Sequence, residues 1–270
     1  MLAHHSPDVI SICTPQHVRY QLIRTIFEHA SPKLLFIEKP VATSIEEALK
    51  IGALAARHHC SILVNHSRRW SKGAERIRQK IRANEYGRLT SMHLRYSRGI
   101  YNSGSHLFDL VRFMAGAISE VKVIEQVPTS LDDKQDWSYS FLFKMKDQSA
   151  GGYAQAYDDR NYNIFELELY FEKGKIEYLH AGDEIRFYSV REHPVQKGLN
   201  MLKQDEVLEG LAGKASSIVL AVEHVKNIVE SAAAPICTLE DGIYPLCVAN
   251  ALIESHQKNG SWETIEIPGL

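Results

Sequence analysis

The chain has 270 residues, a formal net charge of −2 at pH 7, 44% hydrophobic residues and 24% charged residues. This length allows two modest domains, and the near-neutral charge gives no reason to expect nucleic acid or an anionic membrane as partner. No apolar run approaches the ~20 residues that cross a bilayer, and the sequence opens without a signal-peptide pattern. The four cysteines form no close pair. We therefore expect a cytoplasmic protein with reduced cysteines and no metal site.

Strands and helices alternate in the N-terminal part of the chain. Short aliphatic runs typical of buried strands are separated by segments with helical spacing of apolar residues. Ser44 and Glu47 have the spacing of a helix-capping box. The alternation predicts a parallel, doubly wound sheet, and we interpret residues 1–71 as a partial Rossmann-type domain. The expected strands are 8–13, 33–38 and 61–65, and the expected helices are 17–29 and 44–58.

The pattern changes after Lys72. Alternating apolar and polar segments, separated by turn-forming residues, predict a large and mostly antiparallel open sheet with helices on one face. Residues 190–215 are polar and show no clear period. We interpret 72–270 as a second α/β domain for substrate and oligomerisation, whose C-terminal helix can pack back on the first. The expected strands are 88–96, 121–127, 138–145, 150–157, 165–171, 175–179, 184–188 and 262–267, and the helices are 74–83, 104–114, 216–231 and 241–256.

The first candidate site is the sequence Glu38-Lys39-Pro40, which ends an apolar run. Open parallel sheets bind ligands at the carboxyl ends of their strands, where this lysine is expected to lie. A lysine ammonium there would hydrogen-bond a reacting oxygen and favour a developing alkoxide. The alternative is that Lys39 is a strand-end ion-pair partner of Glu38 or Asp8.

His106 is the second candidate, near the start of an expected helix. An imidazole with an unperturbed pKa of about 6.5 suits removal of a hydroxyl proton. Asp109 follows three residues later, so the two side chains share a helix face and the carboxylate could orient the ring. The alternative is an ordinary helix-surface hydrogen bond between His106 and Asp109.

Four motifs in this order give the chain a family resemblance. They are Asp8-Val9-Ile10-Ser11-Ile12-Cys13-Thr14-Pro15, Glu38-Lys39-Pro40, Asn65-His66-Ser67-Arg68-Arg69-Trp70 and Gly104-Ser105-His106-Leu107-Phe108-Asp109. Their order and spacing resemble the Gfo/Idh/MocA oxidoreductases, and Leu239-Glu240-Asp241-Gly242 resembles that family's entry to its C-terminal helix. The resemblance implies NAD(P)-dependent hydride transfer at a hydroxyl or carbonyl carbon of a sugar, cyclitol or nucleotide sugar.

The resemblance also assigns roles to residues. It implies an NAD or NADP cofactor, and a Rossmann domain followed by an α/β domain on an open antiparallel sheet. For the arginines, an ion-pair or stacking cluster with Trp70 is the favoured alternative to a substrate role. The implied catalytic residues are Lys39, His106 and Asn102; the cofactor residues are Thr14, Pro15, Gln16, Glu38, Lys39 and Asn65; the substrate residues are Arg68, Arg69 and Asp109.

The chain also departs from the family pattern. No G-x-G-x-x-G turn precedes Asp8, so we expect the N-terminal part of the Rossmann domain to be lacking. Asn102 stands where the family commonly has aspartate, and an amide cannot accept a proton as a carboxylate can. Gln16 and Arg19 stand where asparagine and histidine are frequent. The alternative function is therefore a truncated or non-catalytic member that has lost dinucleotide binding and acts as a sugar-binding or interaction protein.

The expected partners follow from the same pattern. The resemblance implies a small carbohydrate-type substrate, with no nucleic acid or membrane partner. Aromatic residues in the alternating strands suggest a homodimer or homotetramer formed through the antiparallel sheet. We expect these aromatic side chains to be exposed; they are Tyr153, Tyr157, Phe165 and Tyr170.

Overall fold

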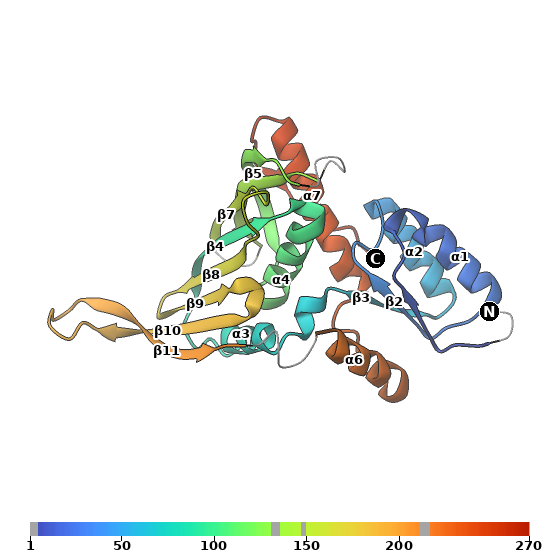
Figure 1. Cartoon of the computed structure of the whole chain (residues 1–270), viewed down its shortest axis with the longest axis horizontal. Coiled ribbons are helices and arrows are strands. Elements are labelled where there is room, and N and C mark those ends of the chain that lie inside the picture. Colours follow the sequence, from blue (N-terminus) through green and yellow to red (C-terminus); the bar gives the residue numbers. More distant parts are fainter. Residues whose placement is uncertain (1–4, 131–135, 147–149, 211–216, 270) are drawn as a thin grey trace. The chain divides into compact units, whose positions relative to one another are not determined.

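The computed structural model divides into two compact units, which are described separately (Figure 1). Among the described residues, no helix combines the length and the apolar character needed to span a membrane. The structure describes residues 5–130, 136–146, 150–210 and 217–269. Unit 1 comprises Met1–Trp70, Ser217–Cys247 and Ile267–Leu270, and unit 2 comprises Ser71–Ser216 and Val248–Glu266.

Unit 1 is built on a three-stranded parallel sheet in the order β1-β2-β3. The strands are β1 (Val9–Ile12), β2 (Leu34–Glu38) and β3 (Ser61–Asn65). Four consecutive residues of β2 are buried, as expected for a strand covered on both faces. Because the strands are parallel and in register, their carboxyl ends lie at one edge of the sheet, with Glu38 opposite Asn65.

Two helices connect the strands of unit 1 (Figure 1). The first, α1 (Arg19–His29), follows a short 3-10 turn, η2 (Gln16–Val18), and the second is α2 (Ile45–Arg57). Both bury a single stripe at helical spacing. A further 3-10 turn, η3 (Ser67–Trp70), follows β3. The predicted order of strands and helices over this region is confirmed.

The start of α2 is capped as the sequence indicates, with one difference. Ser44 Oγ accepts a hydrogen bond from the Glu47 main-chain N–H at 3.1 Å. The Glu47 carboxylate then accepts from the main-chain N–H and the hydroxyl of Thr43 rather than from Ser44. The cap satisfies N–H groups that the first helical turn leaves without intrahelical partners.

Two C-terminal helices also contribute to unit 1. They are α6 (Ser217–Ser231) and the first part of α7 (Leu239–Gln257). The main-chain N–H of Val64 donates to the carbonyl of Cys237 at 3.0 Å. A Cβ atom at Gly242 would lie 2.8 Å from a Val64 methyl group, so only glycine permits this approach of α7 to β3.

Unit 2 is built on a nine-stranded sheet in the order β11-β10-β9-β8-β4-β7-β6-β5-β12. All neighbouring pairs are antiparallel except β4 and β7, which are parallel. The predicted fold class is therefore confirmed. The strands are β4 (Leu89–Ser97), β5 (Ile118–Val127), β6 (Ser138–Met145), β7 (Gly151–Tyr157), β8 (Phe165–Phe171), β9 (Gly174–Leu179), β10 (Glu184–Glu192), β11 (Asn200–Leu208) and β12 (Glu263–Thr264).

One face of this sheet carries the core of unit 2. The helices α3 (Lys72–Arg82) and α4 (Ser105–Ala115) belong to this unit. Nine of the eleven residues of α4 are buried, and Phe108 meets Phe141 of β6 edge to face at 6.1 Å between ring centroids. Such an arrangement is favoured by the ring quadrupoles.

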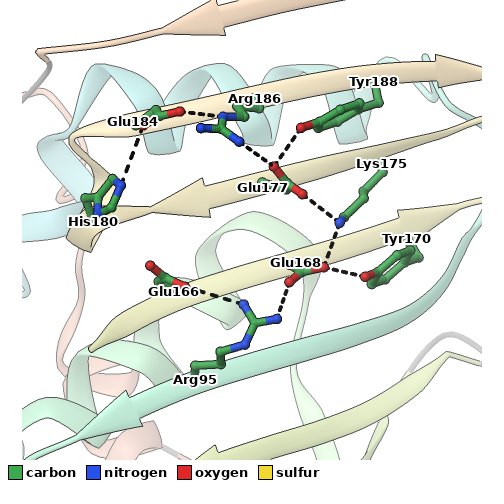
Figure 2. Close-up of polar contacts among 10 residues, drawn as sticks. All are labelled: Arg95, Glu166, Glu168, Tyr170, Lys175, Glu177, His180, Glu184, Arg186 and Tyr188. Carbon is green, nitrogen blue, oxygen red and sulfur yellow. Dashed lines mark hydrogen bonds and ion pairs between the residues drawn. The ribbon is translucent and has the colours of Figure 1, made fainter. Parts of the chain in front are cut away.

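The other face carries a network of charged side chains on β4, β8, β9 and β10 (Figure 2). Lys175 Nζ lies 2.7 Å from both Glu168 and Glu177. Burial raises the pKa of Glu168, but hydrogen bonds from Lys175, Tyr170 and Arg95 outweigh it and lower that pKa to about 2. The Glu168 carboxylate is therefore held firmly in its charged form.

One expectation for unit 2 is corrected, and one segment without a sequence-based prediction is assigned. Phe165 is not exposed, because its ring packs into the core at 6.3 Å from Tyr178. Within residues 190–215, which have no clear sequence period, residues 190–192 complete β10 and residues 200–208 form β11, whereas residues 211–215 lie outside the described residues. The two strands pair as a long hairpin, in which Glu192 and Asn200 are the paired residues next to the turn. Most of β11 is exposed, which explains the missing alternation of apolar and polar residues.

Candidate active site

In unit 1, the predicted cofactor residues lie at the carboxyl edge of the parallel sheet. Thr14 follows the end of β1, Glu38 ends β2 and Asn65 ends β3. Asn65 Nδ2 donates to Glu38 Oε1 at 2.5 Å, which joins the ends of the two neighbouring strands. Pro15 precedes and Gln16 begins the 3-10 turn η2 after β1.

Two buried polar atoms at this edge have no hydrogen-bond partner among the described residues. They are Thr14 Oγ1 and Asn65 Oδ1. Buried polar atoms are almost always satisfied, so these two positions fit a ligand that offers hydrogen-bonding groups. The carboxamide and ribose of a nicotinamide nucleotide carry such groups. For the pyrophosphate no residue is assigned, because the sequence contains no G-x-G-x-x-G turn.

Lys39 is half-buried and is joined to Pro40 by a cis peptide bond. The main chain on both sides of this lysine is held by Arg19, whose Nη1 donates to the carbonyls of Glu38 and Pro40. Nε and Nη2 of Arg19 donate to the Thr14 carbonyl at 2.9 and 2.6 Å. One guanidinium therefore ties the end of β1 to the loop that carries Lys39.

Arg19 was not identified from the sequence as a site residue. The side chain is 3% exposed, and this burial lowers its pKa, partly offset by the charge of Glu38. One signal was available, because Arg19 lies on the same helical stripe as the buried Ile23 and Ile26. An arginine on a buried stripe needs acceptors, and the carbonyls at strand ends supply them.

The arginines of η3 differ in burial. Arg68 is half-buried, whereas Arg69 is 4% exposed. Arg69 Nη1 donates to the carbonyl of Ile236 at 2.7 Å and lies 2.9 Å from Asp241 Oδ2. These contacts fasten η3 to the start of α7, which is the ion-pair alternative considered for Arg69. A substrate role for Arg68 and Arg69 remains a prediction.

In unit 2, the predicted residues occupy successive turns around the start of α4. Asn102 lies in a π-helix, η4 (Gly99–Gly104), that runs directly into α4. His106 is half-buried in the first turn of α4, and Asp109 is almost completely buried one turn later. Ser105 Oγ donates to the carbonyl of Asn102 at 2.9 Å and links the two helical segments.

A second missed residue, Asp136, holds the segment that contains Asn102. Its two carboxylate oxygens accept hydrogen bonds from the main-chain N–H groups of Tyr101 and Asn102 at 2.9 and 3.0 Å. The residues of the candidate site are thus assembled in two groups. Lys39 belongs to unit 1 and His106 to unit 2, and their joint action remains a prediction.

Comparisons with known proteins agree with this fold. Residues 1–66 match the model of the Gfo/Idh/MocA family, described as an oxidoreductase family with an NAD-binding Rossmann fold. The uncharacterized oxidoreductase YrbE of Bacillus subtilis (strain 168) is 30% identical over 134 residues. That match covers 43% of this chain and 39% of the relative, so the chain matches well under half of the curated relative's length.

Solved structures match over nearly the whole chain. Levoglucosan dehydrogenase in complex with NADH has a TM-score of 0.75 at 16% identity, covering 96% of this chain and 80% of that one. An oxidoreductase domain protein from Kribbella flavida has a TM-score of 0.74 at 16% identity, covering 96% and 81%. These likenesses show a shared fold. Together with the match of residues 1–66, they show that the chain resembles the Gfo/Idh/MocA oxidoreductases, whose family model describes an NAD-binding Rossmann fold.

Proposed function

We propose that the protein catalyses hydride transfer between NAD or NADP and a hydroxyl or carbonyl carbon of a carbohydrate-type substrate. The observation that carries the proposal is a pair of buried atoms, Thr14 Oγ1 and Asn65 Oδ1, that have no hydrogen-bond partner in the described part of the chain and lie at or just after the ends of the strands on either side of β2. Both lie in the part of the chain that matches the NAD-binding family model. The carbohydrate class is supported by the structural similarity to levoglucosan dehydrogenase, which is known in complexes with NADH and either L-sorbose or levoglucosan.

The proposed chemistry assigns one role to each residue. His106 accepts the proton of the substrate hydroxyl, since an imidazole is basic enough near neutral pH. The Lys39 ammonium donates a hydrogen bond to the reacting oxygen and stabilises its negative charge. Asn102 hydrogen-bonds the substrate without taking a proton. When bound, the nicotinamide supplies the hydride chemistry.

A first experiment separates this proposal from the alternative of a non-catalytic family member. The alternative is favoured by Asn102, which stands where the family commonly has aspartate. The chain is titrated with NADH and with NADPH and followed by nucleotide fluorescence. Saturable binding at micromolar concentration supports the proposal, whereas no binding at millimolar nucleotide supports the alternative.

The Lys39→Ala variant tests the mechanism. We expect kcat to fall at least about a hundredfold with any sugar, polyol or cyclitol that the parent oxidises, because the charge beside the reacting oxygen is lost. The nucleotide dissociation constant should change little. The matched control is Lys33→Ala, which removes an exposed lysine 2.8 Å from Asp8 in the same unit. Turnover near the parent value would remove Lys39 from the mechanism.

We also propose that the polar face of the nine-stranded sheet mediates homodimer or homotetramer formation. The supporting observation is the network on β4, β8, β9 and β10, in which Glu168 and Lys175 are almost buried within the single chain (Figure 2). Such pre-organised side chains lose little conformational entropy on association. Sedimentation velocity tests the proposal, since a monomer at micromolar concentration would contradict it.

A further inference from the structure

The segment that precedes α4 has an unusual backbone. Arg98 has φ 68° and ψ 44°, in the left-handed region, and the six-residue π-helix Gly99–Gly104 follows it. Gly99 also has a positive φ, of 76°. In proteins, π-helices are rare and occur mostly as single-turn bulges within α-helices, frequently at functional sites. N–H groups at the start of such a turn have no intrahelical acceptor, so they need partners from elsewhere.

Residues at the entrance of β6 supply these partners in succession. Ser138 Oγ accepts from the N–H of Gly99 at 2.9 Å, and the Trp137 carbonyl accepts from the N–H of Ile100 at 3.0 Å. The carboxylate of Asp136 accepts from the next two N–H groups, those of Tyr101 and Asn102. The four consecutive N–H groups of Gly99, Ile100, Tyr101 and Asn102 are thus all bound by three consecutive residues.

The carboxylate of Asp136 is fitted closely to this turn. It is 7% exposed, and each of its oxygens accepts one main-chain N–H. A Cβ atom at Gly99 would overlap the carboxylate, so glycine is required where the turn passes over it. Charge-assisted hydrogen bonds of this kind are stronger than neutral ones, and they offset the cost of burying a charge.

Asp136 is itself fixed to the sheet. The hydroxyl of the buried Thr129 donates to the Asp136 carbonyl at 2.9 Å. Three residues further on, the N–H of Tyr139 donates to the Tyr96 hydroxyl at 2.9 Å, and that hydroxyl donates to the Tyr139 carbonyl at 2.8 Å. The carboxylate therefore sits on a rigid support formed by β4 and β6.

We infer that Asp136 is a positioning residue that fixes Asn102 and the first turn of α4, and thereby His106, in the geometry required for catalysis. The inference rests on the proposed function of Asn102 and His106. It follows from two contacts on either side of Asn102. Asp136 binds its N–H, and Ser105, the residue next to His106, binds its carbonyl.

The test substitution is Asp136→Asn. It preserves the volume of the side chain but replaces one acceptor oxygen by an NH₂ group, which then faces a main-chain N–H. The matched control is Thr129→Val, which removes a buried hydrogen bond at the same place and leaves the carboxylate unchanged. Hydrogen exchange is measured over residues 99–106 and, as an internal reference, over β6.

Asp136→Asn should accelerate exchange of residues 99–106 at least about tenfold while β6 keeps its protection. With the substrate that the parent oxidises, kcat should fall about tenfold to a hundredfold and KM should change much less, because a misplaced base affects the transition state. Thr129→Val should lower the melting temperature but should change neither the exchange of residues 99–106 nor kcat. Equal exchange in Asp136→Asn and parent, or equal loss of kcat in both variants, would overturn the inference.

Two further measurements keep the test decisive. If Asp136→Asn does not fold, exchange is measured for the Tyr101 and Asn102 amides of the parent; protection supports the inference, and exchange at the rate of an open loop overturns it. If the parent binds no nucleotide and shows no turnover, the proposed function fails. The ring NMR signals of His106 then decide the positioning role, because Asp136→Asn should shift them and Thr129→Val should not.

Discussion

Unit 1 holds the end of β2 with a buried cation, whereas unit 2 holds the start of α4 with a buried anion. The difference follows from the backbone groups that need partners at each place. Arg19 binds carbonyls at the ends of strands, and Asp136 binds N–H groups at the start of a helical segment. In both units a single side chain holds the main chain next to a proposed catalytic residue. The comparison indicates that each charge was matched to the polarity of the local backbone.

The largest effect is expected from removing the buried cation of unit 1, Arg19. Arg19→Met should lower the free energy of unfolding by about 3 to 5 kcal/mol, because the carbonyls of Thr14, Glu38 and Pro40 lose a buried donor. Urea denaturation followed by circular dichroism measures the loss. Arg24→Met is the control, since Arg24 is exposed on the same helix and lies 3.9 Å from Glu28. Similar losses in both variants would show that the hydrogen bonds from Arg19 to the main chain do not stabilise unit 1.

Low pH should affect the stabilising charges of the two units differently. The guanidinium of Arg19 in unit 1 keeps its charge in acid, whereas carboxylates in unit 2 lose theirs. The pKa of Glu168 in unit 2 is lowered to about 2. In an unfolded chain it is about 4.3, so its stabilising contribution is complete above pH 4.3 and is lost as the pH falls toward 2. After allowance for solvent screening, Glu168→Gln should cost about 1 to 2 kcal/mol at pH 7 and almost nothing near pH 2.

The measurement for Glu168→Gln is the unfolding free energy as a function of pH. The control is Glu125→Gln, which changes an exposed glutamate of β5 in the same unit. A pH-independent difference between Glu168→Gln and the parent would contradict the expected linkage.

The smallest effect is expected at an exposed helix cap, and it tests whether burial gives the hydrogen bonds of Arg19 their larger effect on stability. Ser44 binds the N–H of Glu47 at the exposed start of α2. Ser44→Ala should cost only about 1 kcal/mol in thermal or urea unfolding, since water can replace the hydroxyl. Ser61→Ala, at the exposed first position of β3, is the control. A cost above that of Arg19→Met would reverse the expected order.

The sequence predicts most of the fold because buried and exposed residues alternate where a strand has one covered face. The bounds of β9 agree with the prediction to within one residue for that reason, because its residues alternate between buried and half-buried positions. The strand β11 was missed because most of its residues are exposed, which leaves no periodic pattern. Lys39 could be located at a strand end from its neighbours alone.

The two charged residues that hold the main chain, Arg19 and Asp136, could not be found from the periodic pattern of the sequence. Arg19 and Asp136 bind main-chain groups, and main-chain groups leave no pattern of residue types in the sequence. Only indirect signs were present, such as the helical stripe shared by Arg19 and Ile23, and Gly99, whose Cβ-free surface accommodates the carboxylate. The residues that position the candidate site are therefore less visible in the sequence than the residues proposed to react.

The hairpin of β10 and β11 has a practical consequence. It extends from the other strands of its sheet, and Val195 near its turn is 84% exposed (Figure 1). Gly198 has no other group within 4 Å of the position where a Cβ atom would lie. Exposed loop tips of this kind tolerate inserted sequences. The turn is therefore a natural attachment point for coupling the protein to a bead or an electrode, through a part of unit 2 that includes neither Asp136 nor His106.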